Sequence, residues 1–265
     1  MIEFKNTVGI VGNGFVGNAI YQNLKDHVPV SVYDINEKRS LNTLKEVLKS
    51  EFIFVCLPTP MKADGECDLS FVNNFFKDIN SKNSLFIIKS TVPIGTTERL
   101  SKERTDLRII HNPEFLTAIN AVEDFKYSDR NIIGGKQNEC LKLKNFYETI
   151  FPATPVSIVS SKESETIKYF CNCFLASKVA LFNNLFEICQ KFNMDYESIR
   201  QAVTADHRIG ESHSKVPGPD GLMGFGGYCF PKDINAFINT LNENEIDASI
   251  FQSVWNYNKN LRDDL

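Results

Sequence analysis

Seven short apolar runs punctuate residues 7–158. They are 7–11, 28–33, 52–57, 85–88, 107–110, 131–133 and 155–158. Most are continuous and rich in β-branched or aromatic residues, as is typical of strands buried on both faces of a parallel sheet. Amphipathic segments typical of helices lie between them, for example at 15–25, 41–49 and 70–79. This alternation predicts an α/β fold with a doubly wound, Rossmann-like parallel sheet.

The pattern changes near residue 160. Apolar residues then recur at helical spacing through one long segment, which predicts a helix over 161–192. Three shorter helices are predicted after it, at 195–203, 231–241 and 246–261. We therefore expect two domains, a sheet domain over 1–158 and an all-helical domain over 159–265.

Composition excludes several classes of protein. The chain has 265 residues and a net charge of −4 without a basic tract, so no nucleic-acid partner is expected. Its longest apolar run is about six residues, too short for a membrane span, and no secretory signal is visible at the N-terminus. The odd count of seven cysteines favours reduced thiols in the cytoplasm. The segment Cys171-Asn172-Cys173 lacks partner ligands at zinc spacing, so no metal is expected.

The segment Gly12-Asn13-Gly14-Phe15-Val16-Gly17 joins the first predicted strand to the first predicted helix. Glycines at this spacing permit a tight turn, approach of the backbone to a pyrophosphate, and close packing of the helix on the strand. Asp34 ends the second predicted strand, where a carboxylate binds ribose hydroxyls and repels a 2′-phosphate. The pattern predicts NAD in preference to NADP, although Lys38 and Arg39 lie nearby. A glycine-rich turn without a ligand is the alternative.

Three polar segments follow consecutive predicted strands. They are Pro58-Thr59-Pro60, Ser90-Thr91-Val92-Pro93 and Asn112-Pro113-Glu114. Open α/β sheets bind ligands at the carboxyl ends of their strands. Strand termination explains any one of these segments, but three in succession favour a ligand site. Glu114 is then predicted as a carboxylate at the mouth of the cofactor cleft.

The decapeptide Gly224-Phe225-Gly226-Gly227-Tyr228-Cys229-Phe230-Pro231-Lys232-Asp233 places a cysteine directly before a predicted helix. Its glycines allow a ligand to approach the backbone. The helix N-terminus and Lys232 both favour a thiolate, which predicts that Cys229 is a nucleophile. A structural cysteine in a tight turn is the alternative. Lys168 and Asn172 are four residues apart and share one face of the long helix, although a solvated helix face also explains this spacing.

These motifs resemble the UDP-glucose/GDP-mannose dehydrogenase family over nearly the whole chain. The segments that carry the resemblance are 12–17, 58–60, 64–65, 68–70, 89–95, 112–116, 129–134, 165–172, 206–210, 216–221 and 224–233. The resemblance implies an NAD-binding N-terminal domain and a helical central domain whose long helix forms a homodimer. It also implies two-fold oxidation of the C6 alcohol of a nucleotide sugar to the carboxylate. Segment 216–221 is most similar to the branch that converts UDP-glucose to UDP-glucuronate for polysaccharide biosynthesis.

The resemblance further implies roles for individual residues. Cys229 would carry a thiohemiacetal and then a thioester. Lys168 and Asn172 would bind the substrate and its oxyanion, Lys168 also serving as a base, and Glu114 would activate water. The other implied catalytic residues, which orient water or an ammonium group, are Thr91 and Asp233. The implied cofactor contacts are those of Arg39, Thr59, Thr91 and Lys232. The implied substrate contacts are those of Phe115, Leu116 and Gly226.

Two features depart from the family pattern. Ala118 stands where the family usually has a second glutamate. The chain also ends at Leu265, and the UDP-binding C-terminal domain does not follow it here, so we expect a fragment, a natural minimal form, or a form that a partner chain completes. UDP-N-acetylmannosamine and GDP-mannose stay open as substrates. A non-catalytic NAD-binding module is the alternative outside the enzymes.

Overall fold

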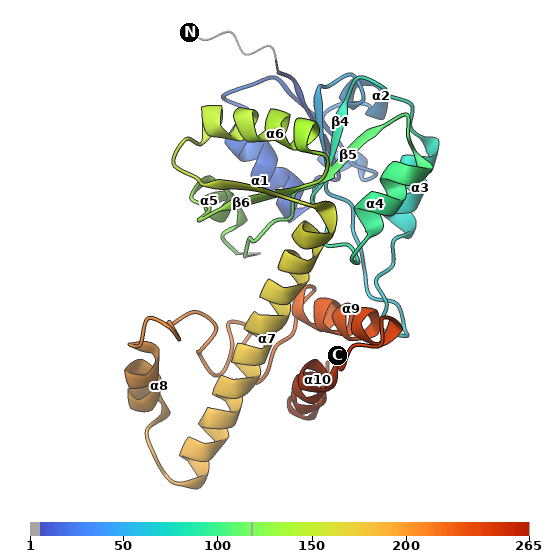
Figure 1. The fold of residues 1–265 in the computed structure, drawn as a ribbon. Helices are drawn as coiled ribbons and strands as arrows, with labels where there is room; N and C mark the ends of the chain where they lie inside the picture. The colour runs from blue at the N-terminus through green and yellow to red at the C-terminus, as the bar shows by residue number, and fades with distance from the viewer. Residues whose placement is uncertain (1–5, 118, 265) are drawn as a thin grey trace. The chain divides into compact units, whose positions relative to one another are not determined.

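The computed structural model describes residues 6–117 and 119–264, so Ala118 lies outside the described residues. The chain divides into two compact units (Figure 1). The first unit contains residues 1–59 and 68–168, and the second contains residues 60–67 and 169–265. The predicted boundary lies at 158/159, whereas the structure groups residues 60–67 with the helical unit and residues 159–168 with the sheet unit.

The first unit is built on a seven-stranded sheet with the order β2-β1-β3-β4-β5-β6-β7. The strands are β1 (Val8–Val11), β2 (Val30–Tyr33), β3 (Phe52–Val55), β4 (Leu85–Ile88), β5 (Arg108–His111), β6 (Asn131–Gly134) and β7 (Val156–Val159). The predicted parallel, doubly wound arrangement is confirmed for β1 to β5. The bridge between His111 and Gly134 is antiparallel, so β6 and β7 run in the opposite direction. A buried apolar run does not specify strand direction, which is why the sequence did not reveal this reversal.

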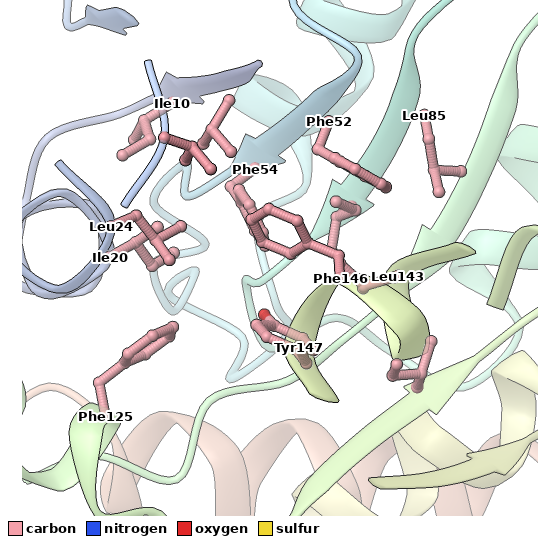
Figure 2. Packing of buried hydrophobic residues seen from close by; sticks show 14 of the residues in the cluster. Ile10, Ile20, Leu24, Phe52, Phe54, Leu85, Phe125, Leu143, Phe146 and Tyr147 are labelled. Atoms are coloured by element: carbon pink, nitrogen blue, oxygen red, sulfur yellow. The ribbon is translucent and has the colours of Figure 1, made fainter. Parts of the chain in front are cut away.

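Helices cover both faces of the sheet and form two apolar cores. One core contains α1 (Phe15–Leu24), α5 (Ala121–Lys126) and α6 (Gln137–Ile150); the other contains α2 (Leu44–Val47), α3 (Ser70–Asp78) and α4 (Thr96–Glu103). On β3, Phe52 and Phe54 point into the first core, and Ile53 and Val55 point into the second. Figure 2 shows Phe54 and Tyr147 in the first core. Burial on both faces explains the continuous apolar runs.

The second unit is helical. It contains most of α7 (Ser161–Lys191), then α8 (Tyr196–Thr204), α9 (Phe230–Glu243) and α10 (Ser249–Leu261). The 31 residues of α7 make a helix about 46 Å long. Asp195 caps α8, because its carboxylate accepts the backbone N–H of Ser198 at 3.0 Å. Among the residues that the structure describes, no helix combines the length and apolar character needed to cross a bilayer.

Segment 60–67 packs within the second unit. Met61 and Cys67 form an isolated antiparallel bridge that closes the segment into a short loop. The side-chain amide of Asn239 on α9 donates to the carbonyl of Asp64 at 3.4 Å. Gly65 lies against the side chain of Asn235 on the same helix. A loop that leaves the sheet after β3 is therefore held by α9.

Candidate functional site

The turn between β1 and α1 has the geometry that a dinucleotide requires. Gly12 has a φ of +91°, and a Cβ there would lie 2.4 Å from the carbonyl oxygen of Cys56. A Cβ on Gly17 would lie 2.0 Å from the carbonyl oxygen of Gly12, so both positions exclude a side chain. A Cβ on Gly14 would meet nothing within 4 Å. Space therefore remains around Gly14, directly before the first turn of α1 with Phe15 and Val16. A pyrophosphate can approach the backbone there.

Asp34 follows β2 and its carboxylate is fixed by the backbone. One oxygen accepts the N–H of Asn13 at 2.6 Å, and the other accepts the N–H of Asn36 at 2.8 Å. The carbonyl of Arg39 accepts from the Asn13 side chain at 2.7 Å, which ties the predicted cofactor residues to the glycine turn. Each carboxylate oxygen can accept a second hydrogen bond. The sheet order reverses at β1, the position at which such folds bind nucleotides, so these residues fit a dinucleotide.

Residues of the three polar segments after β3, β4 and β5 take part in two separate buried contacts. Thr59 is buried, and its hydroxyl donates to the carbonyl of Thr91 at 2.9 Å. Glu114 is also buried, and one carboxylate oxygen accepts Lys168 Nζ at 3.0 Å. The other oxygen of Glu114 accepts the backbone N–H of Leu116 at 2.6 Å. The structure thus brings together Glu114 and Lys168, which are 54 residues apart in the sequence.

The first turns of α7, which carry Lys168, are fixed by a buried carboxylate on the same helix. Glu165 is fully buried, and its carboxylate accepts the backbone N–H groups of Gly95 at 2.6 Å and Thr97 at 2.8 Å, at the N-terminus of α4. Burial raises the pKa of Glu165 although these hydrogen bonds oppose the shift. Lys168 Nζ lies 5.3 Å from the ring centroid of Phe115. Lys168 Nζ therefore lies between a carboxylate and an aromatic face.

A buried network around Asn112, two residues before Glu114, was not predicted from the sequence. Lys89 is 2% exposed, and its Nζ donates to Asn112 Oδ1 at 2.9 Å. The hydroxyl of Tyr147 donates to the same oxygen at 2.7 Å, and Asn112 Nδ2 donates to the carbonyl of Ile132 at 2.6 Å. Burial lowers the pKa of Lys89 to about 8, against the opposing effects of Cys56 and Glu114. A lysine directly after the apolar run 85–88 was the signal that could have revealed it.

The second unit holds the predicted nucleophile. Cys229 is half-buried at the N-cap of α9, and its carbonyl accepts the N–H of Asp233 at 2.8 Å. The Asp233 carboxylate is 1% exposed; it accepts Asn172 Nδ2 at 2.5 Å and pairs with Lys232. Burial opposes the charged form of Lys232, but the charges of Asp233, Cys67 and Cys229 outweigh it and raise the pKa of Lys232. A thiol, an amide donor and a buried carboxylate are thus clustered around the first turn of one helix.

The roles of these residues stay predictions. Lys168 and Asn172 lie one turn apart on α7, and each contacts a carboxylate, that of Glu114 and that of Asp233 respectively. Gly226 lies in the loop before Cys229. Within 6–117 and 119–264, no group of three or more His, Cys, Asp or Glu side chains could hold a metal ion. The described groups suit proton transfer, nucleophilic addition and binding of an oxyanion.

The fold and the glycine turn define the first unit as a nucleotide-binding unit of the doubly wound α/β class. Two domain models of one protein family match this chain. Residues 40–151 match the NAD binding domain of the UDP-glucose/GDP-mannose dehydrogenase family, and residues 162–260 match the central domain of the same family. The chain therefore belongs to the UDP-glucose/GDP-mannose dehydrogenase family, and its cofactor is NAD.

Similar proteins extend well beyond the length of this chain. It is 36% identical over 224 residues to a UDP-glucose 6-dehydrogenase of Rickettsia bellii, covering 81% of this chain and 50% of that protein. A UDP-glucose 6-dehydrogenase of Bacillus subtilis is 32% identical over 229 residues, with 82% and 50% covered. The structure of a UDP-glucose dehydrogenase from Pyrobaculum islandicum matches with a TM-score of 0.85 and 26% identity, covering 98% of this chain and 69% of that one. The chain spans about half the length of the curated relatives it matches.

Proposed function

We propose that this chain oxidises the C6 alcohol of UDP-glucose to the carboxylate of UDP-glucuronate, using NAD twice. The observation that carries the proposal is the cluster around Asp233, in which the amide of Asn172 and the amine of Lys232 meet the first turn of the helix whose N-cap residue is Cys229. A simple alcohol dehydrogenase has no need of a thiol at such a place. The relatives named UDP-glucose 6-dehydrogenase support the choice of substrate.

In the proposed first oxidation, the neutral amine of Lys168 removes the proton of the C6 hydroxyl as hydride leaves C6, and an aldehyde results. Bound NAD supplies the acceptor for this hydride and for the second one. Glu114 Oε1 lies 3.0 Å from Lys168 Nζ, within hydrogen-bond distance, so a proton can pass between the two groups. Arg39, Thr59 and Lys232 are the proposed further contacts of the cofactor.

The proposed second oxidation proceeds through the Cys229 sulfur. The thiolate bonds to the aldehyde carbon, and the oxygen gains a proton from Lys168, forming a thiohemiacetal. This hydroxyl proton then returns to Lys168 as a second hydride leaves the same carbon, which gives a thioester. Water oriented by Thr91 attacks the acyl carbon, Glu114 takes one of its protons, and the carbon–sulfur bond breaks to release the thiolate and the carboxylic acid. The acid loses its remaining proton to solvent and becomes the carboxylate. Asn172 Nδ2, oriented by Asp233, stabilises the oxyanion of each tetrahedral species. The proposed substrate contacts are those of Phe115, Leu116 and Gly226.

Purified protein incubated with NAD and UDP-glucose tests this proposal. We expect two NADH per sugar consumed, with slower or absent turnover of UDP-N-acetylmannosamine and GDP-mannose in parallel reactions. Cys229→Ser should abolish net formation of UDP-glucuronate, whereas Cys171→Ser, a change at another half-buried cysteine, should leave it intact. Full turnover by the Cys229→Ser variant would exclude the thioester route. NAD binding with no NADH from any of the three sugars would leave a binding module instead.

We also propose that two copies of this chain form a homodimer in which α7 of one copy packs against α7 of the other. This helix exposes large apolar side chains in steps of four, seven and seven residues, namely Phe170, Phe174, Leu181 and Ile188. Such spacing gives one continuous stripe suited to a facing helix. Light scattering should give a dimeric mass for the protein and a monomeric mass for Leu181→Glu, with Gln190→Glu as the control. Equal masses for Leu181→Glu and the control would contradict the proposal. The seven free thiols support the proposed cytoplasmic location.

A further inference from the structure

The glycine-rich loop before Cys229 is held by buried side chains of two helices. The side-chain oxygen of Asn258 on α10 accepts the backbone N–H of Phe225 at 2.7 Å, and its amide donates to the carbonyl of Phe225 at 2.9 Å. Asn183 on α7 accepts the N–H of Gly224 at 2.9 Å. Asn258 is 0% exposed and Asn183 is 2% exposed. The side chain of Asn258 therefore bonds both the backbone N–H and the backbone C=O of Phe225.

Two glycines of the loop are needed because α10 lies so close to it. Gly224 has a φ of +71°, and a Cβ there would lie 2.4 Å from Asn258 Oδ1. A Cβ on Gly226 would lie 2.3 Å from a guanidinium nitrogen of Arg262. The Arg262 side chain is 2% exposed and forms ion pairs of 2.7 Å with Asp220 and with Asp264. The end of α10 thus backs the loop with one amide and one neutralised guanidinium group.

Aromatic contacts extend this hold across Cys229. The ring of Phe225 meets the ring of Phe230, the first residue of α9, edge to face with centroids 6.2 Å apart. Trp255 on α10 lies 6.4 Å from Phe225 by ring centroids. Cys229 directly precedes Phe230. It therefore lies in the chain between Phe225, which Asn258 holds, and the start of α9, which Phe225 contacts. If Phe225 lost these contacts, the loop before α9 would become mobile, and the position of Cys229 would no longer be fixed.

We propose that Asn258, backed by Arg262, is a positioning residue for the Cys229 thiol. Its catalytic meaning rests on the proposed function, but its physical effect on the thiol does not. The bonds of Asn258 to Phe225 fix the loop, and the fixed loop keeps Cys229 at the N-cap of α9, where the helix dipole favours a thiolate. Asn258 itself acts only through the backbone of Phe225.

Alkylation of the full chain by iodoacetamide across pH tests this proposal without NAD or sugar. The rate is read separately for the peptides containing Cys229 and Cys171 by mass spectrometry, so the second half-buried thiol serves as a reference in the same sample. We compare Asn258→Ala with Asn260→Ala, a matched change at an exposed position on α10. In Asn258→Ala, the alkylation midpoint of Cys229 should rise in pH and its rate at pH 7 should fall roughly threefold or more, since thiolate fraction sets the rate.

The outcomes separate positioning from general loosening. Unchanged profiles for Cys171 and for Asn260→Ala, with a shifted profile for Cys229, support the proposal. An unchanged Cys229 profile, or an equal shift at Cys171, overturns it. If Asn258→Ala does not fold, Asn258→Asp keeps the acceptor for the Phe225 N–H and should give a smaller shift of the same sign, and no shift there overturns the proposal. A Cys229 shift in a protein that makes no NADH would refute the proposed function alone.

Discussion

Replacing Asn112 with alanine removes the centre of the buried network around that residue. Lys89 loses a charge-assisted hydrogen bond of 2.9 Å, and Tyr147 loses one of 2.7 Å, at a site closed to water. The bond from Asn112 to the Ile132 carbonyl is lost as well. With about 2 kcal/mol for the charged bond and about 1 kcal/mol for each neutral one, we expect the free energy of unfolding to fall by about 4 kcal/mol.

Urea unfolding followed by circular dichroism measures this loss, and the single tryptophan, Trp255, reports the second unit separately. Asn83→Ala, an exposed asparagine in the same unit, is the control. Adding Lys89→Met to the variant removes the stranded ammonium group, so the double variant should be less destabilised than the sum of the single changes by about 2 kcal/mol. A loss below about 1 kcal/mol for Asn112→Ala, or strict additivity, would refute this account of the network.

Three further expectations follow from the same contacts. Burial lowers the pKa of Lys89 in the folded state to about 8. Between about pH 8 and about pH 10.4, Lys89 is therefore protonated in the unfolded state but not in the folded state. The free energy of unfolding should rise with pH across this window in the wild type relative to Lys89→Met. Gly14→Ala should fold normally and bind NAD weakly by calorimetry, whereas Gly17→Ala should lower stability itself, because only the second Cβ meets backbone atoms; equal stability of the two would contradict this. Asp195→Ala should cost about 1 kcal/mol by urea unfolding, because α8 loses its N-cap, and no loss would contradict the capping role.

The sequence predicted those elements best whose residues are buried on both sides. β4 occupies the predicted range 85–88, because all four residues are buried and the run is bounded by polar positions. The second helix was predicted over 41–49 but begins at Leu44. Leu41 and Asn42 donate their backbone N–H groups to the carbonyl of Val32 instead, and Thr43 caps the helix. Such contacts with another strand leave no trace in helical periodicity.

The candidate site divides in the same way. Positions after strands, such as Glu114, could be predicted because strand order places them at one edge. The place of Lys89 directly after an apolar run was a signal, but the hydrogen-bond partners of Lys89 and Asn258 could not be predicted. Each of these bonds joins residues more than 20 positions apart through a single side chain. A lone polar residue within an apolar or helical stretch has no period, so only the folded chain shows its partners.

Segment 60–67 makes the chain cross between the two units three times, at 59–60, at 67–68 and within α7 at 168–169. No single break in the polypeptide yields two intact pieces. A recombinant 1–158 would carry the loop without Asn235 and Asn239, against which it packs, and a recombinant 159–265 would leave α9 uncovered there. Exchange of either unit between relatives therefore requires a graft of two segments, with junctions at both ends of the loop as well as in the long helix.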